Sequence, residues 1–300
     1  MLRQRHESET MTQAQSELSS KNRYASAPKN ADFTIDQQWQ TYSAQEHDRW
    51  DRLCKRQQSI LPNRACEAFL TAMNKLELSA SGIPDMERLS DRLEKLTGWR
   101  VVPVADLVPD EVFFEHLANK RFPAGAFIRP EAEFDYLQEP DVFHDIFGHV
   151  PLLADPVFSE FMQAYGQGGM RALGKGQLHN LARLYWYTVE FGLIQTGGDL
   201  RIYGAGILSS PQESVFSLED ASPNRIQLDL ERVMRTKYII DDFQQTYFVI
   251  ESFEWLLEHC YRDFDSLYAE VKTQSDIEAH ETLASDVVLT RGTHAYFETV

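Results

Sequence analysis

The sequence has few cysteines and no thiolate motif. Its three cysteines are Cys54, Cys66 and Cys260, an odd number at wide spacing, and no Cys-x-x-Cys pair occurs. A disulfide framework needs paired cysteines, and a thiolate zinc site needs closely spaced ones. We therefore expect neither, and we expect a protein of the reducing cytoplasm.

Positive charge is also scarce. The chain has 29 Lys and Arg against 46 Asp and Glu, a net charge of −17. Nucleic acids and anionic membranes both attract positive surfaces, so neither is expected as a partner. The chain also lacks an apolar run of the roughly 18 residues that a membrane-spanning helix requires. Its first 30 residues contain no apolar core of the signal-peptide kind.

The abundant residue types predict a folded core. Hydrophobic residues make up 43% and aromatic residues 12% of the 300 positions, enough for one large domain. Residues 1–30 are polar and are predicted to be a disordered tail. Residues 31–272 are predicted to form the main folded domain, and residues 273–300 a tail of uncertain structure. No second core or linker is evident, so we expect a single domain. We also expect a monomer.

Hydrophobic periodicity predicts a mostly α fold with a few short β-strands, an α+β single compact domain. Start and stop signals place the helices between about 36 and 78, over 85–96, and from 109, 156, 181, 209 and 252. The last of these is predicted to run to about residue 272. Short strands are expected at 99–104, 124–129, 201–203, 206–208, 226–228 and 246–250.

The most informative stretch runs from Pro140 to Pro151 and places His144 and His149 five positions apart in an apolar segment. Pro140 suits the first turn of a helix. On a regular α-helix, residues five apart point about 140° away from each other. Convergence on one ion is therefore expected only if the helix ends between the histidines, and Gly148 supplies such an ending. The spacing excludes the His-Glu-x-x-His motif of zinc proteases.

A third ligand is available in the apolar and aromatic run 181–194, whose only carboxylate is Glu190. A carboxylate in such surroundings is costly unless it is paired, protonated or bound to a cation. Two histidines and one carboxylate form the facial triad of non-haem Fe(II) oxygenases. The alternative is that His144, His149 and Glu190 are residues of the core whose polar atoms are hydrogen-bonded to other protein groups.

Other residues could serve such a site. Arg129 is isolated in an apolar stretch and could hold a substrate carboxylate in a bidentate fork. Alternatively, it is a surface cation paired with Glu131 or Glu133. Asp141 could accept the second ring N–H of His144 and fix its tautomer, or it could merely favour the first helical turn. The aromatic residues near the triad could wall a pocket or belong to the core.

Three segments carry a family resemblance: 136–151, 185–193 and 203–210. They resemble the aromatic amino acid hydroxylases, above all the single-domain bacterial members that act on phenylalanine, and the similarity spans residues 39–262. The resemblance implies a pterin-dependent monooxygenase that converts L-phenylalanine to L-tyrosine, the first step of phenylalanine catabolism. It implies Fe(II), tetrahydrobiopterin or another tetrahydropterin as cosubstrate, and O₂.

The resemblance also implies roles for single residues. His144, His149 and Glu190 match the iron ligands. Positions on the pterin side are Val108, Asp110, Phe113 and Asp145, the last standing where animal enzymes carry glutamate. Positions on the substrate side are Arg129, Tyr136, Pro140, Trp186, Gly206 and Ser209, and Glu139 shares the substrate-side loop with Tyr136.

Three alternatives remain open from the sequence. The same scaffold could prefer tryptophan or tyrosine, although the aliphatic Ile240 favours phenylalanine. A 2-oxoglutarate-dependent dioxygenase uses the same triad, but on a β-barrel and with a different ligand order. A metal-binding protein without turnover is the third possibility. The combination of clamp, ligands and pterin aromatic favours an active enzyme.

Overall fold

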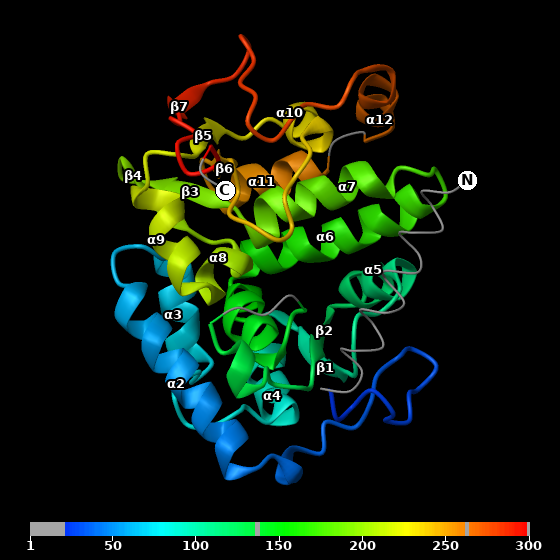
Figure 1. The fold of residues 1–300 in the computed structure, drawn as a ribbon. Helices are drawn as coiled ribbons and strands as arrows, with labels where there is room; N and C mark the ends of the chain where they lie inside the picture. Colours follow the sequence, from blue (N-terminus) through cyan, green and yellow to red (C-terminus); the bar gives the residue numbers. More distant parts are fainter. Residues whose placement is uncertain (1–21, 136–138, 262–263, 299–300) are drawn as a thin grey trace, which may run out of the picture.

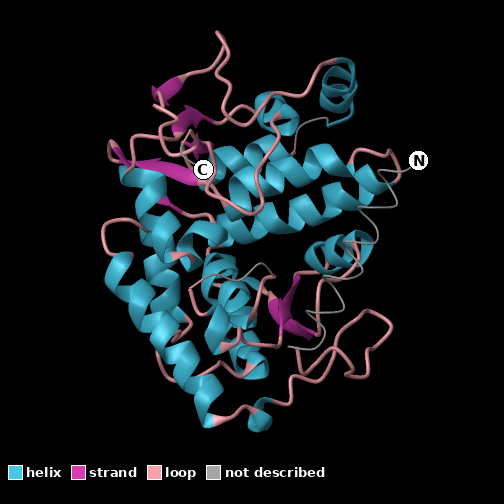
Figure 2. Ribbon diagram, viewed as in Figure 1, coloured by secondary structure: helices cyan, strands magenta, loops and turns pink. Residues whose placement is uncertain are grey.

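The computed structural model describes residues 22–135, 139–261 and 264–298. Helices dominate it and the strands are short, as the sequence predicts (Figures 1 and 2). The α-helices are α2 (Ala44–Ile60), α3 (Glu67–Lys75), α4 (Met86–Thr97), α5 (Asp110–Ala118), α6 (Pro156–Leu173), α7 (Leu178–Tyr185), α8 (Ala205–Ser209), α9 (Pro211–Glu219), α10 (Leu230–Arg235), α11 (Phe253–Cys260) and α12 (Phe264–Thr273). Short 3₁₀ turns are η1 (Trp39–Thr41), η2 (Glu131–Glu133) and η4 (Pro151–Ala154), and η3 (His144–His149) and η5 (Trp186–Glu190) are π-helices.

Two small sheets complete the fold. Strands β1 (Arg100–Val104) and β2 (Arg121–Gly125) pair in parallel. The second sheet has the order β4-β3-β6-β5-β7. Its strands are β3 (Leu193–Thr196), β4 (Asp199–Ile202), β5 (Asn224–Gln227), β6 (Thr246–Ile250) and β7 (Val288–Thr290).

The predicted strand at 206–208 is wrong, because these residues lie in helix α8. A short apolar run cannot be assigned to strand or buried helix by periodicity alone. The extended segment predicted at 124–129 is displaced, since β2 ends at Gly125. The helix predicted over 252–272 is described as two helices, α11 and α12.

Helix starts follow the sequence signals closely. The Asp85 carboxylate accepts hydrogen bonds from two backbone N–H groups at the start of α4, and Gly98 ends that helix at φ 78°. Asp155 caps α6 in the same way, with Pro156 in the first turn. Side-chain caps satisfy backbone donors that have no partner inside the helix. Helix α6 is thereby fixed directly after the segment that carries the two histidines.

Both ends of the described chain pack onto the domain. Tyr24 is only 2% exposed, and its hydroxyl donates to the backbone oxygen of Gln37 at 2.7 Å. The packed structure thus begins before residue 31, so the predicted tail boundary is too late for residues 22–30. At the other end, β7 extends the larger sheet, and Asp286 forms a buried ion pair with Arg232. Among the described helices, none is both long and apolar enough to cross a membrane.

Helices α5 and α6 pack closely because α6 carries glycine at the contact (Figure 1). A Cβ added at Gly166 would lie 2.4 Å from the backbone nitrogen of Ala118. Gly168 lies two residues further along the same helix. A Cβ added there would have only the guanidinium end of the Arg171 side chain within 4 Å.

We therefore expect Gly166→Ala to lower the free energy of unfolding by about 1–3 kcal/mol, since the two helices must move apart. The matched variant Gly168→Ala should be neutral or stabilise by up to about 1 kcal/mol, because alanine favours a helix. Urea unfolding of both variants tests this. Equal stabilities for the two would show that the close contact is unimportant.

Candidate active site

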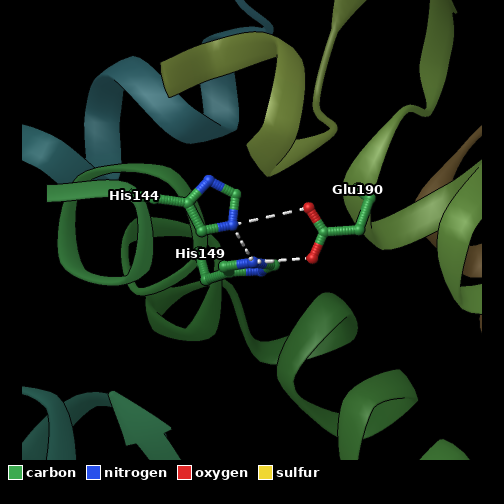
Figure 3. A group of neighbouring side chains, drawn as sticks. All are labelled: His144, His149 and Glu190. Carbon is green, nitrogen blue, oxygen red and sulfur yellow. Dashed lines mark hydrogen bonds and ion pairs between the residues drawn. The ribbon is translucent and has the colours of Figure 1, made fainter. Parts of the chain in front are cut away.

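The two histidines lie in one unbroken helix, contrary to the expectation that the helix ends between them. Residues His144–His149 form a π-helix, in which the Val150 N–H donates to the Asp145 carbonyl. A π-helix links residues five apart, so it places such residues one above the other. The wider turn therefore brings both imidazoles to the same side of the helix (Figure 3).

A π-helix also positions Glu190. Helix α7 widens into a second π-helix, Trp186–Glu190, and the Phe191 N–H donates to the Trp186 carbonyl at 2.9 Å. The chain then turns into β3. Glu190 is thereby held at the end of a helix, facing the two histidines (Figure 3).

The three side chains meet at distances that suit a shared metal ion. His144 Nε2 lies 3.1 Å from His149 Nε2, and the Glu190 oxygens lie 3.6 Å from His144 Nε2 and 2.9 Å from His149 Nε2. Donor atoms about 2.1 Å from one metal on adjacent positions are roughly 3 Å apart. Within the described residues, this is the cluster of histidine and carboxylate side chains that could hold a metal. The donor set of two imidazoles and one carboxylate fits Fe(II).

The electrostatics of His144 and Glu190 favour a ligand state, whereas for His149 burial would lower the pKa but the facing Glu190 raises it overall. Burial lowers the pKa of His144 to about 4, so its imidazole is neutral at pH 7. Burial alone would raise the pKa of Glu190, but the facing His149 and His144 lower it overall, and the backbone N–H of Gly206 also bonds to the carboxylate. A neutral imidazole and an ionised carboxylate are the forms that bind metals.

Ser209, rather than Asp141, contacts the ring of His144. Ser209 Oγ lies 2.9 Å from His144 Nδ1 and donates its own proton to the Ala205 carbonyl at 2.9 Å. The hydroxyl therefore accepts from Nδ1–H, which leaves Nε2 unprotonated toward His149 and Glu190. Second-sphere partners of this kind fix the tautomer of a metal-binding histidine. The predicted contact of Asp141 with this ring is wrong.

Ser209→Ala should weaken Fe(II) binding by about tenfold to a hundredfold, because nothing else would hold the Nδ1 proton in place. The alternative serine next to it, Ser210, caps α9 and provides a control as Ser210→Asn, which retains a capping side chain. Iron titration of both variants is the measurement. Unchanged iron affinity in Ser209→Ala would contradict this role.

Arg129 is buried and bound to Asp141, not to a surface glutamate. Its Nε and Nη2 donate to the two Asp141 oxygens at 2.9 Å each, and both residues are buried. Asp141 also accepts from the backbone N–H of Arg129 and of His144. Burial would raise the pKa of Asp141, but Arg129 lowers it overall. Asp141 therefore links the predicted clamp to the first turn of the segment that carries His144 and His149.

A cavity of 240 Å³ opens onto the triad. All four residues expected on the pterin side line it, together with the triad. Its lining includes Val108, Asp110, Phe113, Asp145, Pro140, Glu139, His144, His149 and Glu190. Asp145 is buried, its Oδ2 accepts from the Gly125 N–H at 2.7 Å, and burial raises its pKa to about 7.

Four further predicted residues, Arg129, Trp186, Gly206 and Ser209, are described by the structure but do not line that cavity. Trp186 opens the π-helix of Glu190, and its ring packs on Phe191 with centroids 4.8 Å apart. A Cβ added at Gly206 would lie 3.1 Å from the Glu190 carbonyl, so a larger residue there would press on the ligand helix. Tyr136 lies outside the described residues.

Three aromatic residues that line the cavity were not predicted: Phe122, Phe127 and Tyr185. Tyr185 lines the cavity five positions before Glu190, and Phe122 packs on the His149 ring with centroids 5.0 Å apart. A π-helix in this segment would predict Tyr185 at the site, because Tyr185 lies five residues, about one π-helical turn, before Glu190. Phe122 gives no comparable local signal, since β2 reaches the site only through the fold.

Comparison with known proteins agrees with this geometry. Residues 16–280 match the family of biopterin-dependent aromatic amino acid hydroxylases, so the chain belongs to that family. Phenylalanine-4-hydroxylase of Caulobacter vibrioides is 62% identical over 265 residues, which cover 88% of this chain and 90% of that protein. The corresponding enzyme of Ralstonia nicotianae is 55% identical over 87% of this chain and 84% of its own length.

A solved structure also matches this chain over most of its length. Phenylalanine hydroxylase of Chromobacterium violaceum, with bound iron(III) and oxidised 7,8-dihydrobiopterin, superposes with a TM-score of 0.84 at 51% identity. The match covers 87% of this chain and 95% of that one. The fold predicted from the sequence, a single-domain hydroxylase of this type, is thereby confirmed.

Proposed function

We propose that this chain is a phenylalanine 4-monooxygenase that converts L-phenylalanine to L-tyrosine with O₂, using Fe(II) and a tetrahydropterin. The observation that carries the proposal is the convergence of His144, His149 and Glu190 at the end of a cavity. The relatives that are named phenylalanine-4-hydroxylase support the reaction and the substrate. A β-barrel dioxygenase is disfavoured, because all three ligands lie on helices.

The triad would hold the iron on one face. Ligands from one side leave the opposite positions free for O₂, water or substrate. When bound, Fe(II) and the tetrahydropterin together activate O₂ for insertion into the aromatic ring. Ser209 keeps His144 Nε2 available as a ligand, and Gly206 holds the Glu190 carboxylate through its backbone N–H.

The pterin would occupy the cavity beside the triad. Phe113 offers an aromatic face there, and Val108 and Asp110 lie on the same wall. The ring of Phe113 already packs edge-on against Tyr185 with centroids 5.7 Å apart, so its orientation is fixed before a ligand binds. A preorganised aromatic surface binds a flat heterocycle at low entropic cost.

Arg129 would hold the carboxylate of phenylalanine. The Arg129 guanidinium donates to Asp141 through Nε and Nη2, and its Nη1 would donate to a substrate oxygen. Pro140 and Trp186 would bound the ring, and Tyr136 with Glu139 would belong to the loop beside it. A fixed guanidinium sets the distance between the substrate's charged end and its ring, and so directs which ring carbon meets the metal.

We also propose a monomer that acts in the cytoplasm, where it begins the breakdown of phenylalanine. The free, buried cysteines Cys54 and Cys66 support that compartment. The catalytic unit is proposed to include the described residues 22–30 and 273–298 in addition to 31–272.

A competition assay tests the substrate. Protein loaded with Fe(II) and supplied with a tetrahydropterin would receive equal concentrations of phenylalanine, tryptophan and tyrosine, and the hydroxylated products would be quantified. We expect tyrosine from phenylalanine to dominate. Dominant hydroxylation of tryptophan would reject the substrate while retaining the reaction class, and pterin-independent product would reject both.

A further inference from the structure

The C-terminal segment, residues 281–298, extends beyond the part of the chain that matches the family, which ends at residue 280. Nevertheless, it packs on the domain beside β5 (Figure 1). The Gly292 N–H donates to Asn224 Oδ1 at 2.9 Å, and the Tyr296 N–H donates to Ser222 Oγ at 3.0 Å. Backbone bonds to buried side chains fix this segment at both of these points.

The end of the segment joins an aromatic cluster of Phe216, Phe243, Tyr296 and Phe297. Phe243 stacks on Phe216 with centroids 4.5 Å apart, and the Tyr296 ring lies 5.3 Å from Phe216 and 5.4 Å from Phe243. The Tyr296 hydroxyl donates to Asp242 Oδ1 at 2.9 Å. Tyr296 is therefore bound to residues 242–243 by both its ring and its hydroxyl.

Residues 238–244 form a loop, hereafter the Trp186 loop, that holds Trp186 on two sides. Tyr238 stacks on the indole with centroids 4.4 Å apart and an interplanar angle of 20°. The indole N–H donates to Gln244 Oε1 at 2.9 Å. The Gln244 Nε2 in turn donates to the Ile239 carbonyl at 2.7 Å, and the Gln244 side chain is buried. Gln244 thus ties the indole to the loop's own backbone.

A continuous set of contacts therefore joins the C-terminal segment to the π-helix that ends in Glu190. Tyr296 contacts Asp242 and Phe243. The next residue, Gln244, accepts the hydrogen bond of the Trp186 indole, and Tyr238 stacks on the same ring. We propose that Tyr296 is a positioning residue that fixes the Trp186 loop and thereby the wall against which the substrate ring binds. This inference depends on the proposed function, because it gives Trp186 the substrate side of the site.

The test is a set of tyrosine variants of the full chain loaded with Fe(II). Tyr296→Phe removes the hydroxyl and its bond to Asp242, and Tyr296→Ala also removes the ring from the cluster. The matched control is Tyr261→Phe, which removes another tyrosine–carboxylate bond, from the Tyr261 hydroxyl to Glu160 Oε1 at 2.8 Å. KM for phenylalanine, KM for the tetrahydropterin and kcat would be measured for each.

We expect the KM for phenylalanine to rise about threefold in Tyr296→Phe and about tenfold in Tyr296→Ala, as lost hydrogen bonds and packing would give. The KM for the tetrahydropterin should stay within about twofold, because the pterin side of the cavity is made by other elements. Tyr261→Phe should leave both constants unchanged. Hydrogen exchange of a peptide covering 238–244 should speed up in the Tyr296 variants only.

Unchanged KM for phenylalanine in both Tyr296 variants would overturn the inference, as would an equal rise in both KM values, which would indicate a general distortion. If Tyr296→Ala does not fold, Tyr296→Phe alone decides the question. A failure of the proposed function gives a different result, because the unmodified protein itself would then not hydroxylate phenylalanine. The exchange measurement needs no activity and therefore tests the contact to the loop by itself.

Discussion

Replacing Glu190 with alanine is expected to abolish stoichiometric Fe(II) binding and to reduce tyrosine formation by at least about a thousandfold, while the folded structure is retained. The two remaining imidazoles would supply only part of a facial triad, and the iron would lose its charged ligand. His144→Ala should give the same result, because it removes a ligand from the same face. Iron content after desalting and the initial rate of tyrosine formation are the measurements.

A second buried glutamate provides the control. Glu213 lies in α9, and its carboxylate accepts from the Tyr247 hydroxyl at 2.7 Å. Glu213→Gln removes a buried carboxylate elsewhere in the domain while keeping an oxygen acceptor, so it should retain one equivalent of iron and turnover. Full iron binding by Glu190→Ala would contradict the assignment of the triad.

Arg129→Ala is expected to have the second largest effect, on both substrate affinity and stability. The KM for phenylalanine should rise about a hundredfold, since a charge-assisted bond to the substrate carboxylate is lost. The free energy of unfolding should fall by about 3–5 kcal/mol, because Asp141 would remain buried without its partner. The KM for the tetrahydropterin should change little.

Asp141→Asn separates these two effects. It keeps the guanidinium but removes the buried negative charge, so it should raise the KM for phenylalanine less than Arg129→Ala does. Steady-state kinetics with each substrate varied in turn, together with urea unfolding, would measure both effects. An equal rise in the two KM values of Arg129→Ala would reject the clamp and leave Arg129 as a structural residue.

The sequence predicted which three side chains meet, but not the helices that present them. Residue types and apolar surroundings were sufficient to select His144, His149 and Glu190. The five-residue spacing was interpreted on an α-helix, where it forbids convergence without a break. The structure resolves this with two π-helices, whose wide turns depend on packing against neighbouring elements and leave no periodic signal in a short segment.

The partners of these residues were harder to predict than the residues themselves. Asp141 lies three positions before His144, so a local contact with the ring was a reasonable expectation. The actual partner of the ring, Ser209, is 65 positions away and is brought close by α8. The alternative reading of Arg129, a surface cation paired with Glu131, fails for the same reason, since Glu131 pairs with Arg49 and Arg52. Contacts between distant segments are fixed by the fold, which local patterns do not encode.

The most direct test of the whole account is to follow oxygen from isotopically labelled O₂ into the product. The protein would be loaded with Fe(II) and given phenylalanine with and without a tetrahydropterin, and tyrosine would be analysed by mass spectrometry. We expect tyrosine that carries one labelled oxygen atom, formed only when iron and pterin are both present. Tyrosine without the label, or no tyrosine from protein with a full equivalent of iron, would contradict the account.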